Sequence, residues 1–474
     1  MKRFATKPCH GLALAIAIAS STSFGAAQAA TDSAAAAPAP AAAVQQGAPM
    51  APPDGTLPPG PPPDGMMGQP PQQEKDASSF SARQIIDNET KSLSQQHITA
   101  TQTDENAVLV RNGGKLTLTN STLHKVGDSS SADASNFSGQ NAVLLAADST
   151  AVLKDLVLTS DADGANAVFA TGSKSHIKAS NLTIHTKNNS SRGLDATYDG
   201  TIEADHVDIT TEGAHCGALA TDRGEGTVIV KDAVIRTSGQ GSPCVYSTGD
   251  IRLTKGTGEA TGSEIAVVEG KNSITLDRAD LTGHVDHGVM LYQSFSGDAG
   301  IGEAHFTAKD STLNNKSDGP MFFITNTRAT ASLERTALKQ SGDVLVNVTS
   351  SRWGKTGANG GDFTLNAKKQ TLAGKILANK ISKVKLALTN GSSWRGSLNE
   401  DQQAASASIS LDRSSRWELT ADSYVTSISD KDATFANIKS NGHSIYYDAS
   451  QNSALAGRTI NLPGGGKLMP QTKA

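Results

Sequence analysis

The stretch that decides the fold is residues 141–186, NAVLLAADSTAVLKDLVLTSDADGANAVFATGSKSHIKASNLTIHT. It opens with Asn141-Ala142-Val143-Leu144, and a close copy, Asn166-Ala167-Val168-Phe169, opens a second unit. Each opening precedes a run in which an apolar or small residue is followed five positions later by an aliphatic one, with a polar turn such as Lys154-Asp155 between them. Short alternating segments of this kind, separated by Gly, Asn and Asp, predict β-strands joined by tight corners.

The same two patterns continue in both directions along the chain. Openings recur about every 20 to 35 residues, at Asn106, Asn141, Asn166, Gly193, Gly217, Val245, Ile265 and Gly288. The five-residue pairs keep in phase with them at Leu118/Leu123, Leu153/Leu158, Ala179/Ile184, Ala204/Ile209, Val230/Ile235, Leu276/Leu281, Ala308/Leu313 and Leu333/Leu338.

One such unit cannot bury its apolar face alone, but stacked units form a continuous core. The repeat therefore predicts an all-β chain whose residues 106–470 form a right-handed parallel β-helix, since parallel crossovers take that hand. About 14 coils of about 25 residues, rising about 4.8 Å each, would give a rod of roughly 65 Å. An antiparallel β-sandwich array is the competing prediction, but its hairpins call for regular two-residue turns that are not seen.

The N-terminal region differs in composition from the repeat. Basic residues 2, 3 and 7, an apolar run over 12–19 and Ala27-Gln28-Ala29 predict a secretory signal peptide over residues 1–29. Thirteen of the 17 prolines fall within the first 71 residues, so residues 30–76 are expected to form a disordered Pro/Ala/Gly-rich linker or stalk. Residues 77–105 are interpreted as an N-terminal cap on the β-helix.

Charge and hydropathy narrow the function classes. After the signal peptide, no run of 18 apolar residues follows, so we expect no integral membrane span in the mature chain. Without the three basic residues of the signal, 39 basic residues face 46 acidic ones, a net charge of −7, which disfavours nucleic acid and anionic membranes as partners. The expected location is secreted or at the cell surface, or periplasmic if the protein is retained.

Two cysteines remain after the signal peptide, Cys216 and Cys244, and an even count in an oxidising compartment favours a disulfide. Each directly precedes a coil opening, so a separation of one coil, about 4.8 Å, would allow them to pair. Asn106, Asn141 and Asn166 are likewise expected to share one corner, where their amides could stack along the rod.

The chain resembles the secreted bacterial right-handed β-helix proteins that are labelled adhesin-like or carbohydrate-binding. The stretches that carry this resemblance are 164–169 (GANAVF), 213–216 (GAHC), 220–227 (ATDRGEGT), 242–250 (SPCVYSTGD), 267–274 (VVEGKNSI), 291–299 (LYQSFSGDA), Trp353-Gly354 and 464–468 (GGGKL). Residues 415–419 (SRWEL) are also similar to the end of autotransporter passenger helices. The resemblance implies a binding role at a cell surface without an established activity.

Aligning the openings places the residues that follow each first strand on one side of the rod. This predicted stripe comprises Tyr198, Asp199, Asp222, Arg223, Asp250, Glu269, Lys271, Tyr292, Gln293, Asn326, Arg328, Arg352 and Trp353. Tyr and Trp rings cover sugar faces, while carboxylates and guanidinium groups bond hydroxyls and acidic groups. The stripe therefore indicates binding of an extended glycan, and a salt-bridged, solvated face is the alternative.

Catalysis by the same stripe is a second possibility that the sequence leaves open. Asp222 and Glu269, two coils apart, would hold their carboxyls near the wide end of the separation used by inverting glycosidases, and Tyr292 lies one coil further. Any β-helix stacks carboxylates at such spacings, so the pattern alone favours no enzyme. No calcium-loop spacing is present, and we expect neither a metal nor a cofactor.

Together these patterns predict an exported, adhesin-like β-helix that binds a polysaccharide or cell-surface glycan without turnover. The alternatives are a polysaccharide-active hydrolase or lyase that uses Asp222, Glu269 and Tyr292, and a structural envelope protein with no specific ligand.

Overall fold

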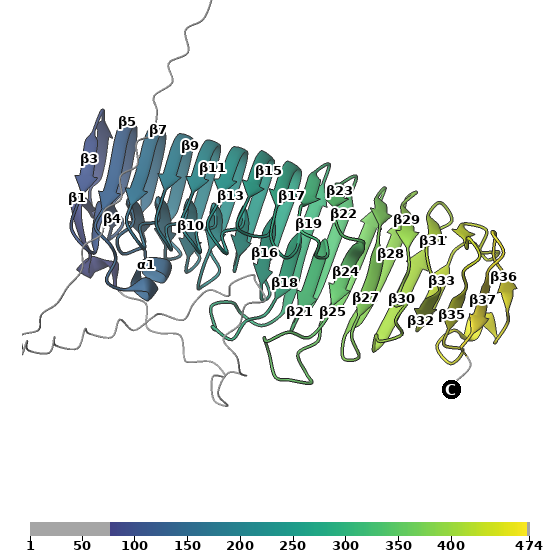
Figure 1. The fold of residues 1–474 in the computed structure, drawn as a ribbon. Coiled ribbons are helices and arrows are strands. Elements are labelled where there is room, and N and C mark those ends of the chain that lie inside the picture. Colours follow the sequence, from purple (N-terminus) through teal and green to yellow (C-terminus); the bar gives the residue numbers. More distant parts are fainter. Residues whose placement is uncertain (1–75, 472–474) are drawn as a thin grey trace, which may run out of the picture. The chain divides into compact units, whose positions relative to one another are not determined.

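The structure is a computed structural model that describes residues 76–471. The signal peptide predicted for 1–29 and the linker predicted for 30–76, except its last residue, lie outside the described residues. Parallel strands stack in chain order into a β-solenoid of about 16 coils (Figure 1). The predicted parallel β-helix is therefore confirmed. No helix in residues 76–471 is both long and apolar enough to cross a bilayer.

One strand of most coils belongs to a sheet of short parallel strands, here called the short-strand sheet. Its members in spatial order are β1 (Ser81–Asp87), β4 (Glu105–Arg111), β6 (Leu144–Ala147), β8 (Val168–Thr171), β10 (Leu194–Thr197), β12 (Leu219–Thr221), β14 (Val245–Ser247), β16 (Ala266–Glu269), β18 (Val289–Tyr292), β21 (Phe322–Thr325), β24 (Val344–Val348) and β27 (Lys375–Ala378).

The other strands of these coils form the long-strand sheet, which bends around the core. Its members in chain order are β2 (Thr90–Ser94), β3 (His97–Ala100), β5 (Lys115–Val126), β7 (Thr150–Asp161), β9 (His176–Thr186), β11 (Thr201–Thr211), β13 (Thr227–Thr237), β15 (Asp250–Ala260), β17 (Ser273–Gly283), β19 (Glu303–Lys309), β20 (Thr312–Asn315), β22 (Arg328–Glu334), β23 (Ala337–Gln340), β25 (Asp362–Lys368), β28 (Lys383–Thr389), β30 (Ser406–Leu411) and β33 (Ser427–Asp430).

Two smaller sheets complete the C-terminal coils. The first contains β26 (Thr371–Ala373), β29 (Ser393–Gly396), β31 (Arg416–Leu419) and β34 (Ile438–Lys439), and the second contains β32 (Ser423–Val425), β35 (Ile445–Tyr447), β36 (Ile460–Asn461) and β37 (Lys467–Pro470). Strand β36 runs antiparallel to β37, so the stack of parallel strands ends there. The described helices are α1 (Ala132–Ser138) and two 3-10 turns, Ala77–Ser79 and Ser453–Leu455.

Each long strand turns a corner at a single left-handed residue. Asp155 lies between Leu153 and Leu158 with φ 54°, and the equivalent residues of other coils include Asn120, Asn181, His206, Asp232, Lys255 and Arg278. Asn and Asp tolerate this conformation better than most residues because their short side chains bond locally. The polar turn predicted between the five-residue pairs is thus one left-handed residue that lets both flanking aliphatic side chains face the core.

The rod encloses one continuous apolar core along its length. Trp394 and Trp417 stack inside it with ring centroids 5.1 Å apart and are 1% and 0% exposed. Each indole N–H donates to a backbone carbonyl, Trp394 to Gly374 and Trp417 to Gly396. Because both rings are buried, they fill the C-terminal coils and offer no sugar platform.

Residues 81–100, within the predicted cap, lie in register with the coils that follow. Strand β1 pairs parallel with β4, and β2 and β3 both pair with β5. The first coil of the solenoid therefore begins at about residue 81 and has the same architecture as its successors.

The predicted disulfide is wrong, because both Cys216 and Cys244 are free and buried. Leu219 pairs with Val245, so this register aligns Cys216 with Ser242, two residues before Cys244. The Cys216 amide accordingly donates to Ser242 Oγ, whereas Cys244 belongs to the apolar core. Burial raises the pKa of each thiol to about 12.

The expected stack of three asparagines is also off by one residue. The strand register aligns Asn106 and Asn166 in one column, with Ala142, and not Asn141, between them. The amide of Asn106 donates to the Gly139 carbonyl and that of Asn166 to the Ser135 carbonyl. These asparagines therefore bond backbone groups of the loop that carries α1 and do not stack on one another.

Candidate functional site

The outward face of the short-strand sheet carries two columns of side chains. Alternate residues of each strand point away from the core, so neighbouring coils place equivalent residues side by side. The first column contains Leu109, Leu145, Phe169, Asp195, Ala220, Tyr246, Val267, Met290 and Phe323. The second runs beside it and includes Thr171, Thr197, Asp222, Thr248, Glu269, Tyr292 and Thr325.

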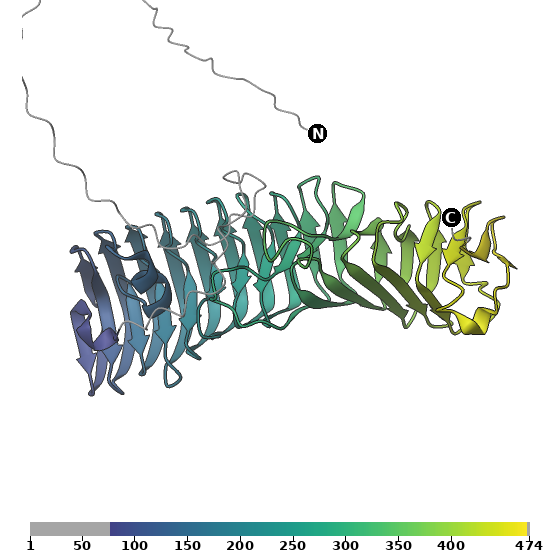
Figure 2. The same cartoon turned by 90° about the horizontal axis from the view of Figure 1, so that it is seen from below.

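These outward columns are largely buried because two connections lie over them. One is the loop that contains α1, which lies over the N-terminal part of the short-strand sheet (Figure 2). Its Gly139 lies close to Leu145 and Phe169 of the apolar cluster on that face. The other is residues 293–302, between β18 and β19, here called the covering loop. Beneath it Tyr246, Val267, Met290 and Tyr292 form a second apolar cluster that is separate from the core.

Helix α1 is short because its ends are fixed by capping. Ser131 accepts a hydrogen bond from the Ala134 amide, and Gly139 ends the helix with φ 75°. A side chain at Gly139 would lie 2.6 Å from Leu145 and 2.7 Å from the Phe169 ring, so only glycine lets the helix approach the sheet this closely. Thr197 Oγ1 then donates to the Phe137 carbonyl over 2.8 Å, which attaches α1 to β10.

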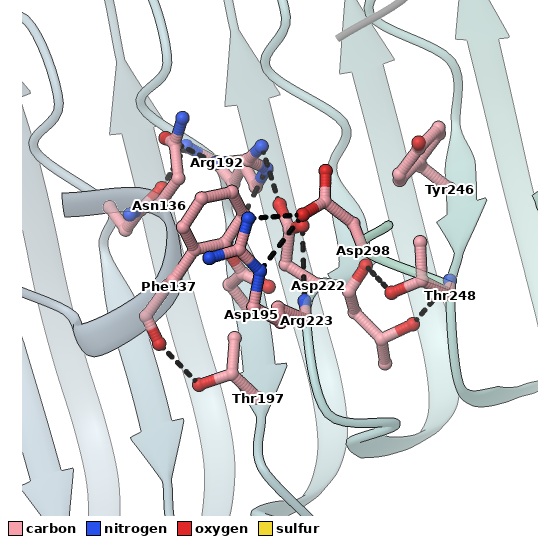
Figure 3. A network of polar contacts seen from close by, with 12 residues as sticks. Asn136, Phe137, Arg192, Asp195, Thr197, Asp222, Arg223, Tyr246, Thr248 and Asp298 are labelled. Atoms are coloured by element: carbon pink, nitrogen blue, oxygen red, sulfur yellow. Dashed lines mark hydrogen bonds and ion pairs between the residues drawn. The ribbon is translucent and has the colours of Figure 1, made fainter. Parts of the chain in front are cut away.

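A buried charge cluster lies where α1 and the covering loop approach each other (Figure 3). The Arg192 guanidinium is fully buried and contacts two carboxylates, with Nη2 2.8 Å from Asp222 Oδ2 and Nε 3.6 Å from Asp195 Oδ2. Its Nη1 also donates to Asn136 Oδ1 of α1 over 2.8 Å. We call Arg192, Asp195 and Asp222 the acid cluster.

An ion pair covers the acid cluster on its outer side. Arg223 donates from Nε and Nη2 to Asp298 Oδ1 of the covering loop, at 2.9 and 2.6 Å. The Phe137 ring lies under the same guanidinium, 3.8 Å from its central carbon. The Arg223 and Asp298 side chains are only 12% and 15% exposed, so one layer of side chains separates the acid cluster from solvent.

Burial dominates the protonation of the acid cluster. It raises the pKa of Asp195 to about 6, against the opposing effects of Arg192 and the Ala196 amide. The pKa of Asp222 is raised well above its ordinary value, first by burial and further by the neighbouring Asp195 and Asp298 carboxylates, while Arg192 opposes the rise. Neither oxygen of Asp195 completes a hydrogen bond within the described residues.

Glu269 forms a second buried acidic centre under the covering loop. Its Oε2 accepts hydrogen bonds from the phenols of Tyr246 and Tyr292, at 2.7 and 2.8 Å, and its Oε1 accepts one from Ser294. Burial raises the Glu269 pKa, and the three hydroxyl donors limit that rise because they favour the ionised form. Ser294 belongs to the covering loop, so its bond to Glu269 holds that loop against the sheet.

Further along the same face, aromatic side chains reach the surface. We define Phe295, Phe323, Trp353 and the adjoining Arg352 and His287 as the aromatic patch. The Trp353 ring centroid lies 5.8 Å from that of Phe295 and 5.7 Å from that of the buried Tyr292. Phe295, Phe323 and Trp353 are each half-buried.

The aromatic patch is held in place by polar contacts. Asn359 Nδ2 donates to the Ser351 and Trp353 carbonyls at 2.6 and 2.8 Å, which fixes the loop that presents the indole. The Arg352 guanidinium lies 4.4 Å from the centre of the Trp353 ring. His287 stacks on Phe323 with centroids 4.1 Å apart. These contacts hold the aromatic patch in place beside the Arg352 cation.

The structure divides the predicted stripe into three groups. Asp222 belongs to the acid cluster and Arg223 to the ion pair that covers it. Glu269 and Tyr292 lie beneath the covering loop, and Gln293 is the first residue of that loop. Arg352 and Trp353 belong to the aromatic patch. The remaining residues lie outside these groups, at corners and strand ends: Tyr198, Asp199, Asp250, Lys271, Asn326 and Arg328. The stripe is therefore not one continuous exposed groove, because Asp222, Glu269, Tyr292 and Gln293 are buried.

Several corner residues already have partners. Asp250 pairs with Arg252 at 2.5 Å and Lys271 pairs with Glu225 at 2.8 Å. Asn326 Nδ2 donates to the Gln293 carbonyl over 2.8 Å and so helps to hold the covering loop. Arg328 is exposed at the start of β22.

Sequence reasoning missed Arg192, Asp195, Tyr246 and Asp298. Asp195 interrupts a column that is otherwise mostly apolar, and that break in periodicity is a signal that could have identified it. Asp298 joins Arg223 across 75 residues of sequence, and nothing local indicates such a contact.

Among the described residues, one group has ligand atoms close enough for a metal ion: Asp205, His206 and Asp232, within 4.8 Å of one another. Lys255 Nζ lies 2.7 Å from Asp232 Oδ1, and this hydrogen bond is the main cause of the lowered Asp232 pKa. Because the ammonium group already neutralises that carboxylate, the group is best described as an ion-pair network at the corners of successive coils.

Comparison with known proteins gives no relative for this chain: no family model, no curated protein and no solved structure matches it.

Proposed function

We propose that the protein is an exported, adhesin-like β-helix that binds a polysaccharide through the aromatic patch. The observation that carries this proposal is the cluster of half-buried rings, Phe295, Phe323 and Trp353, beside the Arg352 guanidinium on one rigid face. Export rests on the predicted signal peptide and linker. The expected ligand is a cell-surface or extracellular glycan.

Physical chemistry favours a sugar over other ligands for this patch. The C–H faces of a pyranose ring are apolar and fit against an indole or phenyl face, while its hydroxyls need polar groups at the edge. Trp353 supplies the face, and Arg352 supplies donors for hydroxyl or carboxylate oxygens. Asn359 holds the indole before any ligand arrives, which reduces the entropy lost on binding.

A regular solenoid also suits a polymeric ligand. Successive coils repeat every 4.8 Å or so, and an extended glycan can follow the rod beyond the patch. The patch then acts as the strongest contact within a longer, weaker surface, as hot spots do in other interfaces.

The test is retention of the protein from residue 30 onward on an array of bacterial, plant and host polysaccharides. Saturable binding that falls at least tenfold in Trp353→Ala, a loss of about 1.4 kcal/mol or more, is the expected result. The matched control is Tyr446→Ala, which removes one ring of the half-buried Tyr424–Tyr446 stack in the last coils and should leave binding intact.

Two outcomes contradict the proposal. Equal loss of binding in Trp353→Ala and Tyr446→Ala would show that the patch has no special role. Absence of binding to every polysaccharide would favour a structural envelope protein.

A further inference from the structure

The coils that carry the aromatic patch differ in charge from the first part of the rod. Residues 321–399 contain 12 basic and 3 acidic side chains, a net charge of +9. Residues 76–300 contain 17 basic and 28 acidic side chains, a net charge of −11. The negative net charge of the whole chain therefore conceals a strongly basic region around the aromatic patch.

Most of this positive charge has no acidic partner. Four of the 12 basic residues form ion pairs with carboxylates: Arg335, Lys368, Lys375 and Arg395. Seven others are exposed and form no ion pair within residues 76–471: Arg328, Lys339, Lys355, Lys369, Lys380, Lys383 and Lys385. The twelfth, Arg352, places its guanidinium over the Trp353 ring. Structural ion pairs thus do not account for the basic character of this region.

Six of these cations lie along one edge of the short-strand sheet, here called the basic edge. Strands β21, β24 and β27 are neighbours in that sheet (Figure 1). The basic edge consists of the cations in the connections that follow these three strands and at the beginnings of β22 and β28, namely Arg328, Arg352, Lys355, Lys380, Lys383 and Lys385.

Hydrogen bonds join the three connections into one surface. The Asn326 amide of the first connection donates to the Asn359 carbonyl of the second over 3.1 Å. Asn379 Nδ2 of the third connection donates to Thr349 Oγ1 of the second over 3.1 Å. The middle connection carries Trp353, and successive coils are about 4.8 Å apart, so cations stand on both sides of the indole.

Two carboxylates adjoin the basic edge. Asp362 begins β25 and lies between Arg328 and Lys383 in the strand register, and Glu303 is paired with Arg328 from the preceding coil. Glu303 accepts a hydrogen bond from Thr330 Oγ1 over 2.5 Å. Because six cations face two carboxylates, the edge keeps a positive charge beside the aromatic patch.

We infer that the glycan bound at the aromatic patch is acidic, with carboxylate, sulfate or phosphate groups that contact the basic edge. The inference rests on the proposed function and adds to it the chemical class of the ligand. Arg352 and Arg328 present planar forks that match the geometry of oxyanions, and the lysine ammonium groups act as point charges along a polymer.

A glycan fits this surface better than a nucleic acid does. Proteins that bind single-stranded nucleic acid stack successive bases on a series of aromatic side chains, whereas the rings here form one cluster. The predicted export also brings the protein to cell-surface and extracellular polymers. One sugar on Trp353, with acidic groups of the same chain on either side, satisfies both the rings and the cations.

The cations act together on a polymeric ligand. A single exposed charge contributes little, because water and salt screen it. A polymer with repeated anionic groups contacts several cations at once, and each contact raises the effective concentration of the next group. Binding should therefore weaken strongly as the salt concentration rises.

The experiment measures retention of the protein from residue 30 onward on dextran, carboxymethyl dextran and dextran sulfate, which share one backbone and differ in charge. Wild type should bind the two charged forms about tenfold more tightly than dextran, or better still, at about 0.1 M salt, and should lose most of this preference at about 1 M. The neutral and acidic polysaccharides of the binding array are measured under the same two conditions.

Two triple variants test the basic edge. The first removes three of its charges and should weaken binding of the charged forms about tenfold: Lys355→Gln/Lys380→Gln/Lys383→Gln. The matched control removes three exposed charges from β5, β7 and β9 and should bind as wild type does: Lys115→Gln/Lys154→Gln/Lys178→Gln. Because all six lysines are exposed, both variants should keep the thermal unfolding midpoint of wild type.

The outcomes separate the inference from the proposed function. Preference for charged forms that is lost in the first triple variant and in Trp353→Ala, and kept in the control, supports the inference. Neutral polysaccharides retained as well as acidic ones, through Trp353, overturn the inference and leave the proposed function intact. Equal losses in the two triple variants also overturn it, as would duplex DNA retained as tightly as dextran sulfate. Binding of charged forms that Trp353→Ala leaves unchanged contradicts the proposed function instead.

Discussion

The outward faces of the two main sheets follow the same alternation of side chains but have different environments. On the long-strand sheet the outward residues meet solvent, and even Val152, Val157 and Val234 are 48%, 41% and 38% exposed. On the short-strand sheet the outward residues Phe169 and Asp195 are fully buried, because α1 and the covering loop lie over them. Two connections thus cover the outward face of the short-strand sheet, and this cover distinguishes it from the outward face of the long-strand sheet.

The comparison also separates two kinds of charge. Ion pairs on the long-strand sheet, such as Arg236 with Asp208, are half-exposed and contribute little. Arg192 with Asp195 and Asp222 is an ion group without solvent, which is costly to form and more costly to break. The short-strand face therefore combines the aromatic patch with buried acids, and within residues 76–471 the long-strand face has neither.

The largest expected effect comes from removing the buried cation. Arg192→Met should destabilise the protein by about 3–5 kcal/mol, because two buried carboxylates would lose their counter-charge. Arg236→Met, the matched change on the long-strand face, should cost less than about 1 kcal/mol. Denaturant midpoints of the two variants and wild type measure the difference. Equal losses of stability in the two variants would mean that the buried and the exposed ion pairs contribute alike, which contradicts the distinction between the two faces.

The second expected effect is on pH dependence. Asp195 has a folded-state pKa raised to about 6, and the pKa values of Asp222 and Glu269 are also raised, so the folded state binds these protons more tightly than the unfolded chain. Their contribution to stability is fully present below the ordinary carboxyl pKa near 4 and is lost as pH rises through 6 and above.

Denaturant midpoints between pH 4.5 and 7.5 test this contribution. Wild type should become less stable as pH rises across that window. The Asp195→Asn/Asp222→Asn double variant should show a flatter profile, while Asp208→Asn on the long-strand face should leave the wild-type profile unchanged. A double variant with the wild-type slope would show that the acid cluster does not bind the protons concerned.

A third effect distinguishes the two cysteines. Cys244→Ser should cost about 1–3 kcal/mol, because it places a hydroxyl in the apolar core. Cys216→Ser should cost less than about 1 kcal/mol, because Ser191 and Ser242 occupy equivalent corner positions and accept the same kind of amide hydrogen bond. Free-thiol titration of the non-reduced, unfolded mature protein should find two thiols. A titration that finds no thiol would show that Cys216 and Cys244 form a disulfide after all.

The smallest effect concerns the corners of the long strands. Arg278 has φ 53°, at a position where several other coils use Asn or Asp. Arg278→Asn should raise stability by about 0.5–1 kcal/mol, since asparagine tolerates the left-handed region better than arginine. Thermal unfolding measures the change. A lower midpoint would mean that the exposed Arg278–Asp277 contact matters more than backbone conformation.

The repeat allowed the fold to be predicted because its signals are local. The five-residue pairs and their polar turns correspond to aliphatic residues on either side of one left-handed residue, as at Leu153, Asp155 and Leu158. The register between coils was harder, because the openings vary in length. Aligning Gly217 with Val245, where the structure pairs Leu219 with Val245, introduced the two-residue error behind the wrong disulfide.

The candidate site could be predicted only in part. Asp222, Glu269, Tyr292 and Trp353 were identified because each follows a short strand or lies near one end of it. The burial of these residues could not be predicted from the sequence, because it depends on connections such as the covering loop. Asp298 of that loop contacts Arg223, which lies 75 residues earlier in the chain. Contacts made by irregular loops have no periodicity in the sequence.

The central claim, that the aromatic patch binds a polysaccharide, can be measured directly by tryptophan fluorescence. The protein has three tryptophans, and Trp394 and Trp417 are buried in the core, which leaves Trp353 as the residue open to a quencher. A bound polysaccharide should reduce acrylamide quenching of wild type and have no effect on Trp353→Phe. Saturable polysaccharide binding that leaves quenching of wild type unchanged would contradict the account.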